Sequence, residues 1–132
     1  MKVLKKFSSL LVIVALTFLS VNCSDNPSST DKQGELEVTM TYSPNPAVVN
    51  TPIEITFEVE EGGEHKAVEE FESEIEKEGT GNHVKMEMNA VENEAGHYRG
   101  EYTFTGAGHY EVHFKFMYDM LQNEKTFEIE VQ

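Results

Sequence analysis

The residues of this chain that could do chemistry are its histidines and methionines. The sequence has 5 His and 6 Met, and imidazole together with thioether is a soft donor set that suits Cu(I). The candidates in the second half of the chain are His83, Met86, Met88, His109, His113, Met117 and Met120. Their chemistry points to binding of a copper ion.

Strand geometry removes several of these candidates. Met86 and Met88 share strand parity with Val84, so we expect both to fill the core, where methionine packs irregular gaps. His109 and His113 share one face of a strand, but four residues at about 3.3 Å each put them roughly 13 Å apart. A metal site therefore needs residues from different strands or from a loop end.

The remaining candidate ligands are His83 and His113 with Met117 or Met120, which lie in or near the turn after the second histidine. The competing interpretation gives each a structural role. The two histidines then lie on a solvated strand face and pair with the abundant glutamates. The two methionines anchor a partly buried loop. The sequence leaves both interpretations open.

Catalytic constellations are missing from the sequence. Carboxylates are plentiful only because Glu is plentiful, so no pair stands out as acid and base. The chain has no Gly-x-Ser-x-Gly turn, and no zinc signature, phosphate loop or calcium loop. His65 and His97 lie beside Gly and Glu in expected loops, and we assign them no role. We expect no enzymatic activity.

The elements that must position these residues are strands. Apolar residues alternate with Glu and Thr over 35–42 and again over 53–60, after a turn that contains prolines. The segment 67–78 fits both a helical stripe and a strand, and we interpret it as a strand or an irregular crossing. Further alternating runs cover 83–90, 98–104, 110–118 and 127–131. About seven short strands punctuated by Gly and Pro predict an all-β, immunoglobulin-like β-sandwich.

The beginning of the chain has the layout of a bacterial secretory signal. Lys2, Lys5 and Lys6 precede an uncharged stretch over 7–21, and that order is typical of an exported protein. The apolar run is short for a membrane span. We therefore predict a signal peptide over residues 1–22.

The single cysteine, Cys23, follows this signal directly. Residues 19–23 resemble a lipobox, so we predict lipid attachment at Cys23. An ordinary cleavage site or an uncleaved anchor is the alternative. Residues 23–34 have no aliphatic or aromatic side chain to bury and should form a flexible tether. Residues 35–132 suit one domain, which we expect at the cell membrane on its extracytoplasmic side.

The charge of the chain limits its partners. The formal charge is −14, and removal of the three N-terminal lysines leaves 7 basic residues against 24 acidic ones, a charge of −17. Such a surface repels nucleic acid and anionic lipid headgroups, so we expect no nucleic-acid partner. The acids are spread along the whole chain, which favours adaptation to the environment over an acidic ligand-binding patch.

Several motifs of the domain occur together in one known family. They are Ser43-Pro44-Asn45-Pro46, the strand over 52–59, the turn over 77–79 that leads to His83, Gly96-His97-Tyr98, and above all the segment from Gly100 to His113. In these motifs the chain resembles the YtkA-like domains, which are related to the FixH-like extracytoplasmic modules. The resemblance spans about residues 35–131.

The resemblance implies an exported, often lipid-anchored sandwich that works near respiratory and copper-handling functions in a binding or accessory role. Family members often carry a His-x-Met element in the turn after the long strand, where this chain reads Met117-Tyr118-Asp119-Met120 without a histidine. Two hypotheses follow. The first is a non-catalytic, membrane-anchored module that docks an envelope protein, and the second is a copper-binding protein or metallochaperone with His and Met ligands.

Overall fold

The computed structural model describes residues 34–132. The expected signal peptide, Cys23 and nearly all of the tether lie outside the described residues. Within 34–132 the regular elements are strands, and there is no helix of the length and apolarity that a membrane crossing requires. The strands are β1 (Leu36–Ser43), β2 (Pro52–Glu61), β3 (Glu64–His65), β4 (Glu69–Lys77), β5 (His83–Met86), β6 (Asn89–Ala90), β7 (His97–Thr103), β8 (Gly108–Tyr118) and β9 (Leu121–Val131).

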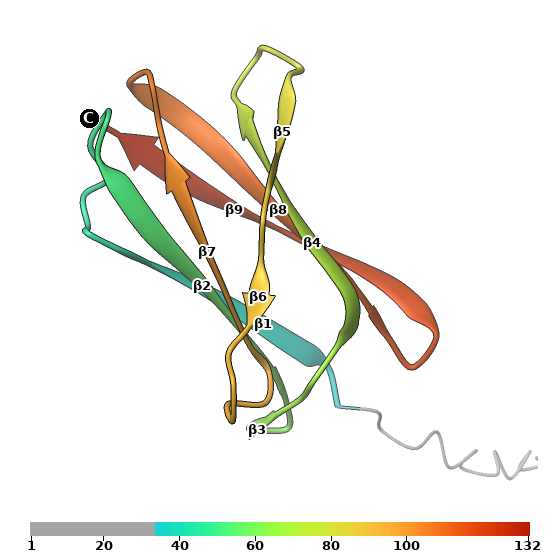
Figure 1. Cartoon of the computed structure of the whole chain (residues 1–132). Helices are drawn as coiled ribbons and strands as arrows, with labels where there is room; N and C mark the ends of the chain where they lie inside the picture. The colour runs from blue at the N-terminus through green and yellow to red at the C-terminus, as the bar shows by residue number, and fades with distance from the viewer. Residues whose placement is uncertain (1–33) are drawn as a thin grey trace, which may run out of the picture. The chain divides into compact units, whose positions relative to one another are not determined.

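The strands form two antiparallel sheets that pack face to face (Figure 1). Sheet A has the order β1-β2-β7-β6, with β3 paired to the end of β2. Sheet B has the order β5-β4-β8-β9. Seven strands are longer than two residues, and β3 and β6 add short pairings to sheet A. The predicted β-sandwich is confirmed.

The core forms because every second side chain of the central strands is apolar. Ile53, Ile55, Phe57 and Val59 of β2 are fully buried, and Tyr110, Val112, Phe114 and Phe116 of β8 face them from the other sheet. Across the interface the rings of Phe57 and Phe114 stack with centroids 4.3 Å apart and planes 9° apart. Burial of each such side chain contributes about 1.5–3 kcal/mol, so this contact helps to hold the two sheets together.

The segment with an ambiguous pattern, 67–78, is a strand. Its alternation is blurred because the register of β4 against β8 shifts between Glu69 and Glu72, and Glu70 has a positive φ of 48°. Beyond this irregularity Ser73 and Ile75 point inward. The buried hydroxyl of Ser73 donates a hydrogen bond to the carbonyl of His113, 2.9 Å away.

The alternation over 83–90 predicts a single strand, but this prediction is wrong, because the run is divided between two sheets. The chain leaves sheet B after Met86 and joins sheet A at Asn89. At the crossing its backbone lies against Gly100 of β7, where an added Cβ would come within 2.6 Å of the carbonyl oxygen of Glu87 and of the sulfur of Met88. The missing side chain of Gly100 is what lets the chain change sheets here.

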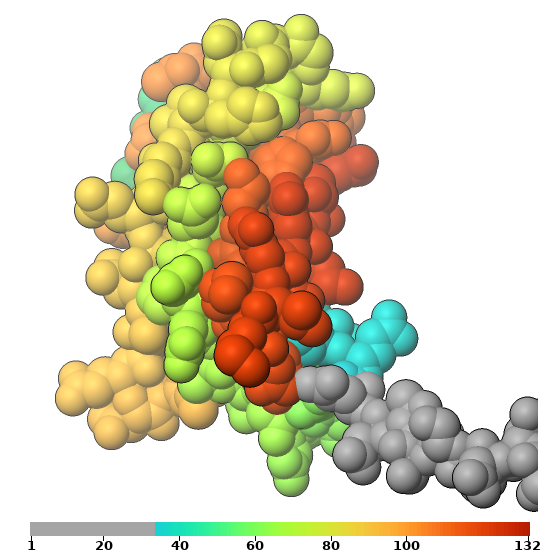
Figure 2. All heavy atoms as spheres, turned by 90° about the vertical axis from the view of Figure 1, so that its right-hand side faces the viewer, coloured from blue at the N-terminus to red at the C-terminus, as the bar shows by residue number. Residues whose placement is uncertain are grey.

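Because the inner faces are apolar, the charged side chains of each strand alternate onto the outer faces. On sheet B they form rows that run across the strands. One row is His83, Glu76 and Glu111, and the next is Lys85, Glu74 and His113. In Figure 2 the yellow-green strands β4 and β5 lie beside the orange and red hairpin of β8 and β9. This arrangement places two of the predicted ligand residues next to each other.

Candidate functional site

The outer face of sheet B carries a cluster of Glu76, His83 and His113, here called the sheet B cluster. One ligand atom from each of the three residues lies within 4.8 Å of the other two. Nε2 of His83 is 3.3 Å from Oε2 of Glu76, and Nε2 of His113 is 4.0 Å from the same oxygen. The two imidazole rings are 5.7 Å apart. Three strands thus bring two imidazoles to one carboxylate.

The order of the strands explains this geometry. β4 lies between β5 and β8, so a residue of β4 can meet partners on both sides. Glu76 is directly opposite His83 in the register, and His113 is opposite Glu74, one row away on the same face. From these positions the side chains of His83 and His113 both extend toward Oε2 of Glu76.

His113 is oriented by the strand that follows it. Its Nδ1 lies 3.1 Å from Oε1 of Glu124 and 3.2 Å from Oγ1 of Thr126, both on β9. A carboxylate can only accept, so the contact with Glu124 places a proton on Nδ1 and leaves the lone pair of the neutral ring on Nε2. Metal-binding histidines are held by such a contact in many proteins.

The other nitrogen of His113 faces carboxylates without a hydrogen bond. Nε2 is buried and makes no hydrogen bond within residues 34–132, although Oε2 of Glu111 is 3.5 Å away. In the neutral ring Nε2 and these carboxylates are all acceptors and repel one another, and either a proton on Nε2 or a bound cation removes that repulsion. A bound metal ion would satisfy both Nε2 and the carboxylate of Glu76.

The neighbouring carboxylate of Glu74 already has a partner. Nζ of Lys115 donates to its Oε2 at 2.7 Å, and this hydrogen bond is the main reason why the pKa of Glu74 lies below its ordinary value. The same bond raises the pKa of Lys115. Oε2 of Glu74 is therefore occupied. Glu76 accepts a hydrogen bond from the backbone N–H of Gly81 at Oε1, and its Oε2 is the carboxylate oxygen that lies near both histidines.

The structure does not bring the predicted methionine ligands to the histidines. Met117 is four residues beyond His113 on β8, about 13 Å along the strand, where it pairs with Glu69 and Gln122. Met120 lies in the turn between β8 and β9 and is 92% exposed. In Figure 1 this turn is at the opposite end of sheet B from the start of β5. The described cluster offers nitrogen and oxygen ligands in place of thioethers.

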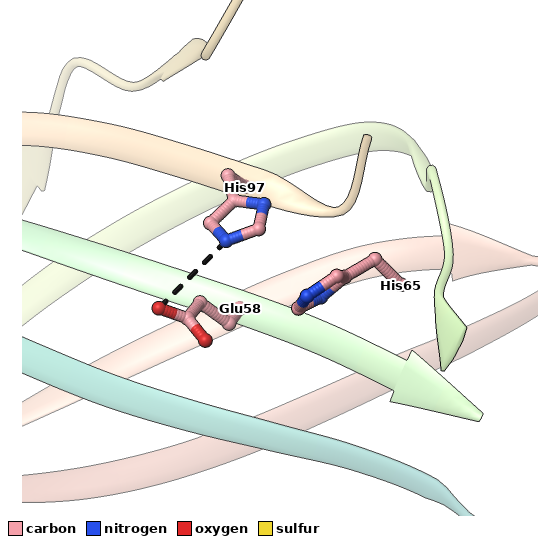
Figure 3. Close-up of side chains that lie close together, drawn as sticks. All are labelled: Glu58, His65 and His97. Carbon is pink, nitrogen blue, oxygen red and sulfur yellow. Dashed lines mark ion pairs between the residues drawn. The ribbon is translucent and has the colours of Figure 1, made fainter. Parts of the chain in front are cut away.

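Two histidines to which the sequence assigned no role also come together. His65 and His97 lie on the outer face of sheet A with ring centroids 4.5 Å apart, and Glu58 completes the group (Figure 3). His109, in contrast, is at the start of β8 opposite Glu130 and belongs to neither group.

Comparison with known proteins identifies the family. The model of the YtkA-like family matches residues 30–115, more than half of the 132 residues. The chain therefore belongs to the YtkA-like family. The matched range includes both His-Glu groups and ends before Met117 and Met120. No curated protein matches the chain.

Two solved structures share the fold. A DUF4785 family protein from Legionella pneumophila superposes with a TM-score of 0.59 at 7% identity over 76% of this chain, which spans only 30% of that protein. A DUF4426 family protein from Pseudomonas aeruginosa superposes with a TM-score of 0.56 at 16% identity, over 74% of this chain and 90% of the other. At such identities the likeness concerns the fold alone.

Proposed function

We propose that this member of the YtkA-like family is a lipid-anchored, non-catalytic accessory protein of the extracytoplasmic space that binds a transition metal ion at the sheet B cluster. The observation that carries the metal proposal is the geometry of His113. Its Nδ1 is held by Glu124, and its buried Nε2 faces Glu76 without a hydrogen bond. His83 supplies the second imidazole from the other side of that carboxylate.

The donor set indicates which ion is preferred. Two imidazoles and one carboxylate suit borderline divalent ions, and Cu(II) binds such ligands more tightly than Zn(II) or Ni(II). Cu(I) prefers thioether and thiolate sulfur, and no sulfur is part of the described cluster. We therefore propose that the site binds copper in its divalent form, and that it binds Zn(II) more weakly.

The cellular place of the protein rests on the first residues of the chain. A basic start, an uncharged run and Cys23 support export and lipid attachment, and the family match supports an extracytoplasmic accessory domain. A protein held at the membrane by a tether can take up an ion and present it to a neighbour in the envelope. Binding and transfer would need no catalytic group.

The test is a titration of the full-length chain, purified in detergent, with Cu(II) and Zn(II) against a competing chromophoric chelator. The double variant His83→Ala/His113→Ala should lose one bound ion per chain. The matched control is His109→Ala, because His109 is an exposed histidine of β8 outside the cluster. This control should bind like the wild type. Equal binding by wild type and double variant would refute the proposed site.

Docking of an envelope protein is the second candidate function, and the edge of sheet B is its candidate surface. β9 is 11 residues long and pairs with β8 on one side, and on its other side one described bridge joins Val131 to Ala47. An extended segment of a partner could add to such an edge. Exposed glutamates along β9 oppose edge pairing, so a partner would need basic residues. A pull-down from membranes tests this function.

A further inference from the structure

We propose that Glu58, His65 and His97 form a second, separate site for a divalent transition metal ion on the outer face of sheet A, here called the sheet A cluster. One ligand atom of each residue lies within 4.8 Å of the others. The donor set is again two imidazoles and one carboxylate, which suits Cu(II) and Zn(II). This inference does not rest on the sheet B cluster, because the two groups lie on different sheets and share no residue.

The position of His65 is fixed by a tight turn. Gly62 and Gly63 both have positive φ, 61° and 82°, as a two-residue hairpin of type I′ requires. The turn folds β3 back onto β2 and sets His65 opposite Glu60. His65 is thereby placed one row from Glu58 on the same face of the sheet.

The position of His97 depends on Gly96. β7 begins directly after this glycine and pairs with β2, so that His97 lies opposite Glu58. A Cβ on Gly96 would meet the carbonyl oxygen of Val59 at 2.7 Å and the backbone of Lys66 at 2.9 Å. Because Gly96 has no side chain, β7 can begin next to β3, and the two imidazole rings meet.

The hydrogen bonds of His97 prepare one nitrogen for a ligand. Its Nδ1 is 3.1 Å from the carbonyl oxygen of Ala95. A carbonyl only accepts, so Nδ1 carries the proton and the lone pair of the neutral ring is on Nε2. Nε2 faces Oε1 of Glu58 at 3.8 Å (Figure 3). As at His113, two acceptors face each other where a cation would bind both.

His65 closes the group from the solvent side. Its Nδ1 is 3.4 Å from Oε1 of Glu60, so a carboxylate outside the three proposed ligands can hold the ring. The side chains of His65 and Glu58 are 42% and 37% exposed, against 18% for His97. Ligands of a tetrahedral zinc ion lie about 3.3 Å from one another, given bonds of about 2.0–2.2 Å. Rotation of the exposed side chains would bring the ligand atoms, which now lie within 4.8 Å of one another, to this shorter separation. Water can complete the coordination.

The experiment counts ions bound to the full-length protein in detergent. Zn(II) is titrated against a chromophoric chelator for the wild type, the two double variants His83→Ala/His113→Ala and His65→Ala/His97→Ala, a combined variant with all four changes, and the control His109→Ala. We expect two ions for the wild type and the control, one for each double variant and none for the combined variant. If His65→Ala/His97→Ala binds as many ions as the wild type, the sheet A site is refuted, whatever the other double variant does.

A milder variant guards against damage to the fold. His65 is exposed and lies at the end of a hairpin, so His65→Asn should leave the melting temperature of the metal-free protein unchanged. It should weaken one of the two binding events at least tenfold. As a site-specific measurement, Zn(II) should shift the ring proton resonances of His97 in the His83→Ala/His113→Ala protein. Unshifted resonances at saturating Zn(II) would overturn the proposal.

Discussion

Glu76 and His83 lie directly opposite each other in the register of β4 and β5, with Oε2 and Nε2 3.3 Å apart. The same relationship occurs on sheet A, where Glu58 lies opposite His97. In both places a second histidine reaches the carboxylate from a neighbouring strand. The common element of the two clusters is therefore a Glu that lies opposite one histidine in the register. On sheet B the second histidine comes from the other side of β4, whereas on sheet A both histidines lie on the same side of β2, away from β1.

Replacement of this carboxylate on sheet B should weaken metal binding with little effect on the fold. Glu76→Gln preserves the size of the side chain but removes the negative charge and the strong oxygen ligand, so we expect at least a tenfold loss of Cu(II) affinity. The measurement is competition with a chelator. The control is Glu128→Gln, the same change on β9 in the same row of the sheet. Equal effects of the two changes would show that only overall charge matters.

The ion pair of Glu74 and Lys115 should contribute to stability within a limited pH range. The pKa of Glu74 is lowered from its ordinary value of 4.5 by the hydrogen bond from Lys115. Its contribution is therefore complete above pH 4.5 and is lost as the pH falls through the lowered pKa. The pKa of Lys115 is raised from 10.5, so its contribution is complete below pH 10.5 and is lost as the pH rises through the raised pKa.

A double-mutant cycle with Glu74→Gln and Lys115→Met measures this pair on the metal-free protein. We expect a coupling free energy of about 0.5–1 kcal/mol at pH 7 from urea unfolding, because both side chains are partly exposed. The coupling should be smaller at pH 3, because this pH is below the ordinary carboxyl value of 4.5 and the contribution of the carboxylate is lost as the pH falls through the lowered pKa. A coupling that is equal at both pH values would contradict the assigned cause of the pKa shift.

The crossing from sheet B to sheet A should depend on the size of residue 100. Gly100→Ala would place a methyl group 2.6 Å from the carbonyl oxygen of Glu87, and relief of this clash requires a backbone shift that costs about 1–3 kcal/mol. The control is Gly106→Ala, where the nearest atom is the flexible Nζ of Lys77 at 3.4 Å. Thermal unfolding compares the two. If Gly106→Ala were the more damaging change, the crossing would have another cause.

The sequence predicted those features of the fold that depend on local alternation. The inward positions of Phe57 and Phe114 follow from strand parity, which is set by adjacent residues. The crossing at Glu87 could not be read in the same way, because it depends on Gly100, a residue of a different strand. An alternating pattern shows which face a residue takes, but not which sheet its strand joins.

The same limit applies to the candidate sites. The sequence placed His83 and His113 on outward faces, but their approach depends on β4 lying between β5 and β8. For His65 part of the signal was present, since Gly62 and Gly63 between two alternating segments indicate a two-residue hairpin. His97 reaches the same cluster through the register of β7 against β2. These two strands are far apart in the sequence, so no local sequence pattern predicts their register.

Attachment to the membrane should depend on Cys23 alone. With the proposed signal removed, the remaining chain would have a formal charge of −17, so its surface would be repelled by anionic headgroups and would not hold the protein at the bilayer. Cys23→Ser should therefore move the protein from the membrane fraction to the soluble extracytoplasmic fraction, or leave an unprocessed precursor. Mass spectrometry of the N-terminal peptide should show a lipid only in the wild type and in the control Ser24→Ala. A Cys23→Ser protein that is cleaved normally and still sediments with membranes would indicate a protein partner as the anchor.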